Sequence, residues 1–364
     1  MRTLGLAVGY LLFLLVVAEL AARLLLALPL VADHRRFHDE LSWRRGWVRR
    51  HRAEAEIRYE FDVYDPATGW RPRPGLRDVP VFGDKVLNTN SRGLRGRREY
   101  AYGKRPDGPR LLVLGDSFTF GDEVSDTETY PHYLEERLPC AEVLNMGVHG
   151  FGHDQMLILL RTEGVRYRPD VVLLGFVAAD MSRNLVGFRD YAKPRFVRDG
   201  PGLRLVGSPV PAPAEILREE WARPRLRDMW SLAVHEFRKW TGLEEKEERA
   251  LTARVLDEMA AVAGRAGAAF VLAYLPVWQE IESGAATTAG ERFLFDYCAG
   301  RPGLRCVSTR PAFTGSATGG ASYRRGTHWT PAGHRAAAAA IAAHLGLRCP
   351  EGAPAPGAAG GPGS

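Results

Sequence analysis

The chain has 364 residues, of which 45% are hydrophobic and 25% are charged. This balance is ordinary for a globular protein that buries a substantial core. Lysine and arginine exceed aspartate and glutamate by 49 to 43, which gives a formal net charge of +6. Apart from a cluster at 35–52, the arginines are spread along the chain rather than gathered with aromatic residues on one element. We therefore predict no nucleic-acid partner.

The N-terminal residues are strongly apolar. No charge occurs from Thr3 to Ala18, and the sequence is apolar again after Glu19 and Arg23. These two residues are four apart, so they can pair on a helix, which lowers the cost of placing both in a bilayer. The run is long enough to span a membrane, whereas a cleaved signal needs only the shorter apolar block. We predict an uncleaved anchor over residues 1–32, with a cleaved signal peptide as the alternative.

The segments after the anchor are charged and then rich in proline and glycine. Because a series of arginines follows the anchor and only Arg2 precedes it, the positive-inside rule would leave the rest of the chain in the cytoplasm. We expect residues 33–60 to form a charged helical stalk that leads away from the membrane. Residues 66–80 predict loops and short strands.

Residues 111–121, Leu-Leu-Val-Leu-Gly-Asp-Ser-Phe-Thr-Phe-Gly, are the most informative segment. Four apolar residues predict a short buried strand, which Gly115 and Asp116 end abruptly. Ser117 then lies at the carboxyl end of the strand, where open α/β sheets bind their ligands. On these residues alone an ordinary turn is the more common explanation, so the rest of the chain must supply the support for a nucleophile.

Strand and helix patterns alternate through the rest of the chain. The pattern predicts buried strands at 142–146, 171–176 and 269–274, and helices at 130–138, 153–164, 251–266, 287–299 and 332–345. This order is typical of a parallel sheet with helices on both faces. Residues 187–245 interrupt it with several prolines, and we interpret them as an insertion that forms a cap or a substrate rim. Residues 350–364 are Pro, Gly and Ala in the main and predict a disordered tail.

The four cysteines are Cys140, Cys298, Cys306 and Cys349, and they match no zinc-binding spacing and form no Cys-x-x-Cys pair. Outside the cytoplasm, Cys298 and Cys306 are close enough in the chain to bridge. Four cysteines permit three pairings, and a reduced structural role is an equal alternative. We predict no metal and no other cofactor.

Glycine-rich turns after the strands and a late histidine complete the pattern. The segments are Gly115-Asp116-Ser117, Asn145-Met-Gly147-Val-His149-Gly150, the strand that runs on to Asp180, and Gly326-Thr-His328-Trp. In this order they resemble the SGNH/GDSL hydrolase superfamily and its membrane-anchored bacterial branch, in which segments like 69–75 and 90–96 precede the Gly-Asp-Ser strand. The resemblance implies a flavodoxin-like α/β fold of three layers over residues 61–349. It also implies that this domain lies outside the cytoplasm.

A serine hydroxyl is a weak nucleophile until a base takes its proton. His328 is the best candidate base, because the resemblance brings the histidine before the last helix beside the first strand. Thr330 and Pro331 also predict a capped helix start, which is compatible with catalysis because the cap fixes the loop. We therefore predict Ser117 and His328 as the catalytic pair. His334 lies inside the helix and is predicted to be structural.

The resemblance also predicts an oxyanion hole. The attacked carbonyl oxygen needs preorganised donors, and the backbone N–H groups of Ser117 and Gly150 are the candidates. Two family residues are missing. Ala179 stands where the family has a donor asparagine, and Arg325 and Gly326 stand where it has the aspartate that orients the histidine. We therefore expect a Ser–His dyad in which a backbone carbonyl holds the imidazole.

Four polar residues are expected to support the pair or line the substrate rim. Asp116 braces the turn, Asp180 lies at a strand end that faces the crevice, and Asn184 could supply the missing donor from the following loop. Asn145, from the second glycine-rich segment, is the fourth.

Together these features imply a membrane-tethered ester hydrolase that transfers an acyl group through its serine. Its partner would be an ester-bearing small molecule or an acylated cell-surface carbohydrate. Two alternatives stay open. The chain could be an O-acyltransferase that passes the acyl group to a sugar of an exported polysaccharide. The two missing family residues also permit a catalytically impaired relative that binds glycans or acts as a scaffold.

Overall fold

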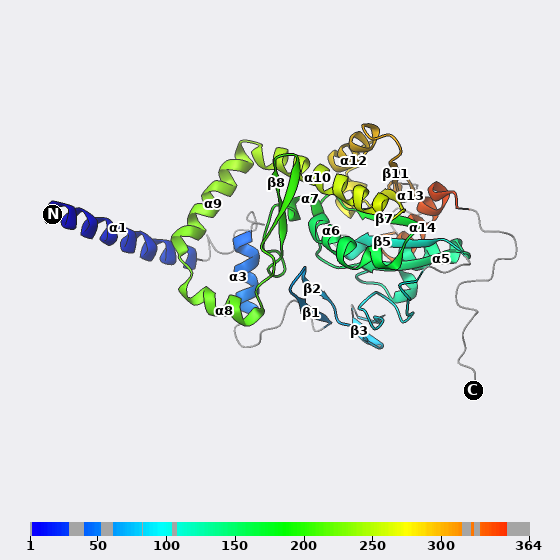
Figure 1. Ribbon diagram of the computed structural model, residues 1–364, viewed down its shortest axis with the longest axis horizontal. Helices are drawn as coiled ribbons and strands as arrows, with labels where there is room; N and C mark the ends of the chain where they lie inside the picture. The colour runs from blue at the N-terminus through cyan, green and yellow to red at the C-terminus, as the bar shows by residue number, and fades with distance from the viewer. Residues whose placement is uncertain are drawn as a thin grey trace.

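The computed structural model describes residues 2–28, 40–51, 61–81, 83–103, 108–314, 322–323 and 328–347. At its centre is a five-stranded parallel sheet in the order β11-β10-β7-β5-β6 (Figure 1). The strands are β5 (Arg110–Gly115), β6 (Glu142–Gly147), β7 (Val171–Phe176), β10 (Ala269–Tyr274) and β11 (Arg305–Ser308). The chain adds β6 on one side of β5 and the later strands on the other, so the strand order reverses beside β5. In such sheets the ligand crevice opens at this reversal, at the carboxyl ends of the strands.

Helices cover both faces of the sheet and confirm the predicted three-layer α/β class. One face carries α6 (His153–Thr162), α10 (Leu243–Arg265) and α12 (Ala289–Ala299), and the other carries α5 (Tyr130–Arg137) and α14 (Pro331–Leu345). Successive strand side chains point to opposite faces. Leu112 of β5 therefore belongs to the first core and its neighbour Leu111 to the second.

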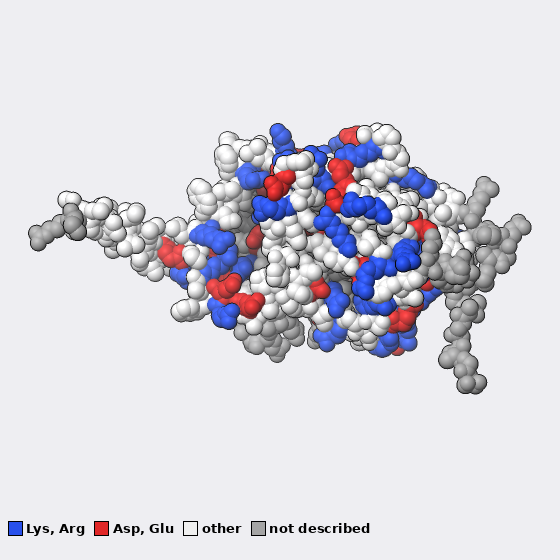
Figure 2. Space-filling view, in the orientation of Figure 1, with Lys and Arg blue, Asp and Glu red and all other residues white. Residues whose placement is uncertain are grey.

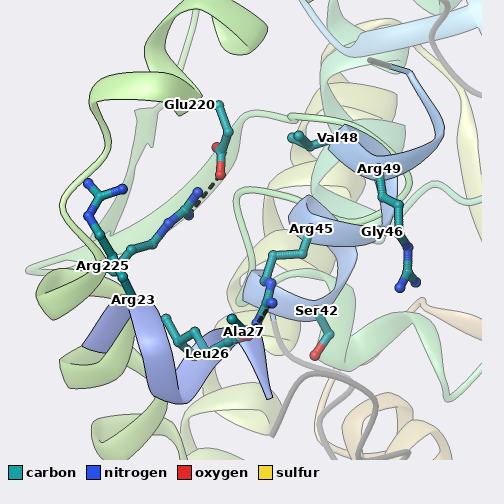
Figure 3. Close-up of a pocket in the computed structure, with 10 residues that line it drawn as sticks. All are labelled: Arg23, Leu26, Ala27, Ser42, Arg45, Gly46, Val48, Arg49, Glu220 and Arg225. Carbon is teal, nitrogen blue, oxygen red and sulfur yellow. Dashed lines mark hydrogen bonds and ion pairs between the residues drawn. The ribbon is translucent and has the colours of Figure 1, made fainter. Parts of the chain in front are cut away.

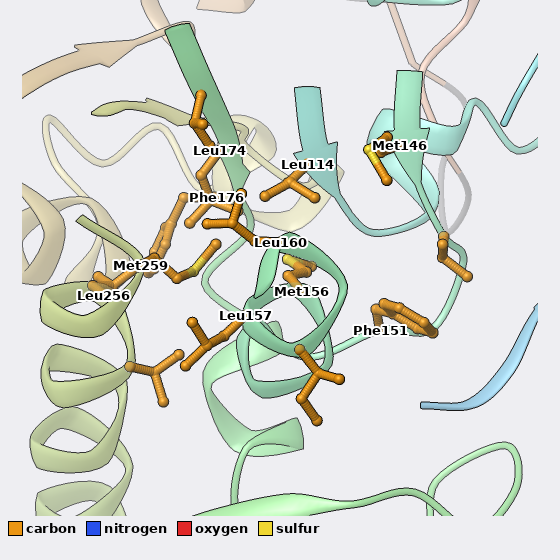
Figure 4. Packing of buried hydrophobic residues seen from close by; sticks show 14 of the residues in the cluster. Leu114, Met146, Phe151, Met156, Leu157, Leu160, Leu174, Phe176, Leu256 and Met259 are labelled. Atoms are coloured by element: carbon orange, nitrogen blue, oxygen red, sulfur yellow. The ribbon is translucent and has the colours of Figure 1, made fainter. Parts of the chain in front are cut away.

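Figure 4 shows the first of these two cores. Leu114, Met146 and Leu174 descend from β5, β6 and β7, and Met156 and Leu160 of α6 pack beneath them. In parallel register, residues 111–114 of β5 lie opposite 143–146 of β6 and 171–174 of β7. Because both faces are covered, every residue of these three strands is buried, as the continuous apolar runs predict.

The remaining elements lie around the sheet layers. Before β5 come α1 (Arg2–Ala27), α3 (Glu40–Arg50), β1 (Asp62–Asp65), β2 (Gly69–Pro72), β3 (Val79–Val81) and β4 (Lys85–Leu87). After β5 come α4 (Ser117–Phe120), η1 (Asp126–Glu128), η2 (Gly164–Tyr167), α7 (Asp180–Arg183), β8 (Arg195–Asp199), β9 (Gly202–Val206), α8 (Pro213–Ala222), α9 (Arg225–Trp240), α11 (Trp278–Glu282) and α13 (Pro311–Thr314). The pairs β1–β2, β3–β4 and β8–β9 are antiparallel.

Two differences from the predicted elements have physical causes. α10 begins at Leu243 rather than at 251, because its first two turns are charged and show no apolar face. β11 has no predicted counterpart, since this edge strand has only four residues and all of them are half-buried. The other sheet strands and their covering helices lie within a few residues of the predicted ranges.

The charged segment after the anchor packs against the body. Trp47 of α3 is fully buried, with its ring 6.1 Å from that of Phe188 and 5.1 Å from that of Tyr191. α3 is therefore part of the folded body. Residues 29–32 of the predicted anchor, residues 33–39 and 52–60 of the predicted stalk, and the predicted tail at 350–364 lie outside the described residues.

Two further features, an apolar helix and a disulfide, are relevant to the cellular compartment of the protein. The segment Thr3–Ala27 is long and apolar enough to cross a membrane, with a mean hydropathy of 2.3 in its most apolar window. A disulfide joins Cys298 at the end of α12 to Cys306 in β11, which is one of the pairings that the sequence permits. Cys140 is also disulfide-bonded, and Cys349 lies outside the described residues.

Candidate active site

Ser117 begins α4 directly after β5, at the reversal of the strand order. The short helix sits close on the strand end because Gly115 has no side chain. A Cβ there would lie 1.9 Å from Oγ1 of Thr119. Asp116 caps the helix, with its carboxylate accepting the backbone N–H of Phe118 at 2.9 Å. The core of the sheet and this cap together fix the position of the serine.

The structure brings His328 to Ser117. Nε2 of the imidazole lies 2.8 Å from Oγ of the serine, although the two residues are 211 positions apart. The imidazole also packs on Phe118, with ring centroids 4.9 Å apart. The two residues that the sequence predicts as a pair are therefore in hydrogen-bonding contact.

The residues that follow His328 hold it in place. Trp329 is buried, and its indole N–H donates to the carbonyl of Pro276 at 3.0 Å. Thr330 caps α14 by accepting the backbone N–H of Gly333, as the sequence predicts. The buried indole and the helix cap thus fix the backbone that carries the imidazole.

The other imidazole nitrogen faces a carboxylate that the sequence analysis missed. Oε1 of Glu123 lies 3.2 Å from Nδ1 of His328. Glu123 is in the loop after α4, with a φ of +68°, a left-handed conformation that is uncommon for glutamate. Arg325 and Gly326, the positions where the family has its acid, lie outside the described residues. The sequence predicts a dyad held by a backbone carbonyl. In the structure His328 instead contacts Ser117 through one ring nitrogen and Glu123 through the other.

The charges around His328 favour its protonated form. Burial lowers the pKa of His328, but the hydrogen bond to Glu123 and the charges of Asp122 and Asp116 outweigh burial and raise it. If Nδ1–H donates to Glu123, the lone pair of Nε2 faces the hydroxyl of Ser117. We assign this tautomer from the partners of the two nitrogens.

Arg95 holds the loop that carries Glu123. Its guanidinium donates to the carbonyls of Gly121 at 3.3 Å and Val124 at 2.8 Å, and its Nε lies 2.5 Å from a carboxylate oxygen of Asp126. The side chain is buried. Both ends of the loop are therefore bound to a residue of the 90–96 segment that precedes β5.

His149 supports the same loop from the other side. Its Nε2 lies 2.8 Å from Asp62 of β1, and its Nδ1 lies 3.7 Å from Asp122, the neighbour of Glu123. All three side chains of this row are buried. Burial lowers the pKa of His149, but the two carboxylates outweigh burial and raise it. His149 thus bridges β1 and the loop through two carboxylates.

Asp116 and Asp180 form a buried acidic pair with Arg183 behind the serine. Nη1 of Arg183 lies 2.5 Å from Asp180 and 3.3 Å from Asp116, and it donates to the carbonyl of Phe151 at 2.8 Å. Oδ2 of Asp116 also lies 3.4 Å from Oγ of Ser117. Burial raises the pKa of Asp180 well above its ordinary value, and the charge of Asp116 raises it too, against the opposing effect of Arg183.

The two asparagines predicted near the site are engaged elsewhere. The amide of Asn145 donates to the carbonyl of Thr119 at 2.9 Å, so it supports α4 from beneath. Asn184 accepts the backbone N–H of Asp154 at 3.1 Å and donates to Thr252 at 2.9 Å. The prediction that Asn184 supplies the missing oxyanion donor is therefore wrong, because both ends of its amide are bonded in the interior.

A cleft of about 1080 Å³ opens in front of His328. Ala179 lies exposed on its wall and presents only a methyl group, and Gly150 lies in the turn after β6 with a φ of +76°. The inserted residues 187–245 form one wall of the cleft. The residues from this insertion and from α3 include Glu40, Trp43, Ser231, Val234, His235 and Arg238.

Comparisons with known proteins give matches among solved structures only. No family model and no curated protein match the chain. TesA is 16% identical over 65% of this chain and 98% of its own, with a TM-score of 0.40. A GDSL-like lipase from Bacteroides thetaiotaomicron is 14% identical over 66% of this chain and 89% of its own, with a TM-score of 0.38. An acetylxylan esterase from Geobacillus stearothermophilus, solved as a catalytic mutant, is 15% identical over 68% and 98%, with a TM-score of 0.40.

Proposed function

We propose that the protein is an SGNH/GDSL-type serine hydrolase that cleaves ester bonds. Ser117 is the nucleophile, His328 the base and Glu123 the acid that orients the imidazole. The observation that carries this proposal is the contact of 2.8 Å between Oγ of Ser117 and Nε2 of His328, continued by the contact of 3.2 Å to Glu123. A nucleophile, a base and an orienting carboxylate in one row are the parts that acyl transfer needs.

The reaction begins with attack of the serine oxygen on the ester carbonyl carbon. Nε2 of His328 takes the hydroxyl proton, and the carbonyl oxygen becomes an oxyanion. When the intermediate collapses, the bond to the leaving alcohol breaks, and the imidazolium returns its proton to that alcohol. The acyl group is then carried by Ser117. Water attacks this acyl-enzyme with His328 again as the base, which releases the acid and restores the serine.

The oxyanion is stabilised by the backbone N–H groups of Ser117 and Gly150. Ala179 supplies no side-chain donor at the third position. Loss of one such donor costs about 3 kcal/mol in a measured case. We therefore expect a slower enzyme than one with the asparagine, rather than an inactive protein.

The protein acts at a membrane and outside the cytoplasm in this proposal. Disulfides persist mainly in oxidising compartments, and the Cys298–Cys306 bond supports that location. An uncleaved α1 is supported by Glu19, whose two carboxylate oxygens accept the backbone N–H groups of Arg225 and Leu226, each at 2.9 Å. Removal of α1 would leave the first turn of α9 without this cap. The substrate in this location is an acylated cell-surface carbohydrate.

A serine-directed fluorophosphonate probe tests the proposal. We expect stoichiometric labelling of the full-length protein and no labelling of Ser117→Ala. Ser182→Ala is the matched control, because Ser182 lines the same cleft and its hydroxyl donates to the carbonyl of Ala179. This variant should be labelled normally. Folded wild-type protein that takes up no probe would refute the hydrolase and favour a glycan-binding relative.

Transfer of the acyl group to a sugar is the second candidate. The cleft of about 1080 Å³ is much larger than a short acyl chain, which leaves room for an acceptor beside the acyl-enzyme. Incubation with an activated acetyl ester and an oligosaccharide distinguishes hydrolysis from transfer to the sugar. Free acetate as the main product supports hydrolysis, whereas an acetylated oligosaccharide in excess over acetate supports the transferase.

A further inference from the structure

α9 carries an apolar stripe that nothing in the described part of the chain covers. We define the α9 stripe as Leu226, Trp230, Phe237 and Trp240, all of which are exposed. The two tryptophans expose 72% and 83% of their surface. Because these residues are three, four or seven positions apart in sequence, they lie on one face of the helix. Exposed apolar patches of this kind mark binding surfaces.

The opposite face of α9 is polar and bound to the body. Asp228 is buried and lies 2.7 Å from Arg223, which follows α8, and 2.9 Å from Arg225 of α9 itself. Two turns further on, Nδ1 of His235 lies 2.9 Å from Glu244 of α10. The pairs with Arg223 and Glu244 fix the rotation of α9, so its apolar stripe faces outward.

α9 is attached to the apolar helix α1. Besides the Glu19 cap on the first turn of α9, Arg23 donates to the carbonyl of Arg223 at 3.3 Å. Ala22 and Leu26 are the buried residues of α1, and every residue from Thr3 to Val17 is exposed. Within the described residues, α1 therefore contacts the body through its last turns, at the start of α9 and at Arg45 of α3.

The length of α1 places this junction at a membrane surface. From Thr3 to Arg23 the helix rises about 30 Å, which equals the thickness of the hydrocarbon core. The start of α9 would then lie where the hydrocarbon ends and the headgroups begin. Figure 1 shows that α9 runs across the axis of α1 rather than along it, so α9 would lie along the membrane plane.

Arginines surround the same junction. Arg23, Arg45 and Arg225 line a cavity of about 330 Å³ between the end of α1, α3 and Glu220 of α8 (Figure 3). In Figure 2 the blue atoms of basic residues gather where α1 joins the body. Positive charge at this level suits the phosphates of lipid headgroups.

We propose that α9 is an interfacial helix whose stripe inserts into the headgroup region of the bilayer that α1 spans. Tryptophan is enriched at membrane interfaces because its ring has an apolar body and a polar N–H. An amphipathic helix with aromatic residues on one face is the usual form of such a contact. The inference rests on the membrane anchor of the proposed function. Since the other face of α9 lines the catalytic cleft, the substrate is an ester carried by a membrane-linked molecule.

Quenching of tryptophan fluorescence by lipid tests this contact. The full-length protein is reconstituted in phosphatidylcholine–phosphatidylglycerol vesicles whose acyl chains carry bromine near the headgroup. A variant with Trp230→Phe and Trp240→Phe keeps the aromatic surface of the stripe, and it should lose a large part of the quenching. Trp278→Phe, in the cleft wall, is the control and should lose none. Undiminished quenching in the double variant would refute the proposal.

A charge in the stripe gives a second readout. In Trp230→Glu/Trp240→Glu we expect kcat/KM for a vesicle-embedded ester to fall about tenfold, because a carboxylate is unfavourable at the interface. Activity on a soluble ester should not change. Phe295→Glu on α12 is the matched control. If the variant instead dissociates a dimer in detergent and lipid quenching is unaltered, the stripe binds a second copy and the proposal fails. The quenching needs no catalysis, so its failure is distinct from failure of the hydrolase.

Discussion

The two residues that flank His328 are positioned by different parts of the molecule. Ser117 belongs to the sheet: it follows β5 directly, and glycine and aspartate neighbours set its helix on the strand end. Glu123 belongs to a loop, which Arg95 holds at both ends and which the Asp62–His149 pair supports at Asp122. One partner of the imidazole is therefore fixed by the α/β core and the other by the chain that precedes that core.

This difference gives the N-terminal segment a role beyond connection. β1 supplies Asp62, and Trp70 of β2 donates its indole N–H to the backbone carbonyl of His149 at 3.0 Å. With Arg95, these contacts make the segment before β5 part of the site. Damage to this segment should weaken catalysis through Glu123 and leave Ser117 in place.

The largest expected effect comes from Glu123→Gln. The variant keeps the shape of the side chain but removes the charge that orients the imidazole, and we expect kcat to fall by about 10²–10⁴-fold. His328 must be neutral to act as a base. Because its pKa is raised, the acid limb of the wild-type pH–rate profile should lie above the ordinary histidine pKa of about 6.5. Because Glu123 contributes to that rise, the limb should move to lower pH in the variant.

The matched control for this experiment is Glu136→Gln, an exposed glutamate on α5. Its kcat and its pH profile should equal those of the wild type. A Glu123→Gln variant with the wild-type pH profile would show that another group orients the imidazole.

A smaller effect is expected from Arg95→Lys. Lysine keeps the charge opposite Asp126 but cannot hold the carbonyls of Gly121 and Val124 together. We expect kcat/KM to fall about tenfold, with labelling of Ser117 by the fluorophosphonate slowed but complete. The control Arg97→Lys, which alters an exposed pair with Asp78, should have no effect.

Combining Arg95→Lys with Glu123→Gln sharpens the test. If Arg95 acts only through Glu123, the double variant should be no slower than Glu123→Gln alone. Multiplied losses would mean that Arg95 acts on the site by another route.

The smallest effect is expected from Asp180→Asn. Burial raises the folded-state pKa of Asp180 above its unfolded value of about 3.9, so its contribution to stability is full below that value and is lost as the pH rises through the folded-state pKa. Asparagine does not titrate. The free energy of unfolding, measured with urea, should therefore fall less between pH 4 and pH 8 in the variant than in the wild type. The activity of the variant should stay within about twofold of the wild-type activity. A wild-type pH dependence in Asp180→Asn would assign the effect to other groups.

The contrast between the two partners also explains what the sequence could predict. The strand before Ser117 has a continuous apolar run, and His328 precedes a helix with a recognisable Thr330–Pro331 start. Both signals are local, and both predictions place the residue where the structure has it. The α/β class follows from the same alternation of local patterns, whereas the four-residue β11 is too short to produce one.

Glu123 gives no such local signal. It lies in a loop without periodicity, and its position depends on Arg95, which is distant in sequence. The nearest hint is that two acidic residues, Asp122 and Glu123, follow the Gly-Asp-Ser turn and a glycine. The exposure of the apolar face of α9 could not be predicted from the sequence for a related reason. Its apolar spacing predicts a buried face as readily as an exposed one, and only the packing of the polar face distinguishes them.

The left-handed backbone of Glu123 lowers the stability of the fold, whereas its carboxylate faces the imidazole of His328. A side chain in that conformation costs about 1–2 kcal/mol, which glycine would not incur. Selection for stability alone would favour glycine at this position, but glycine has no carboxylate. In this chain, Glu123→Gly should therefore raise the free energy of unfolding and remove the carboxylate that faces Nδ1 of His328.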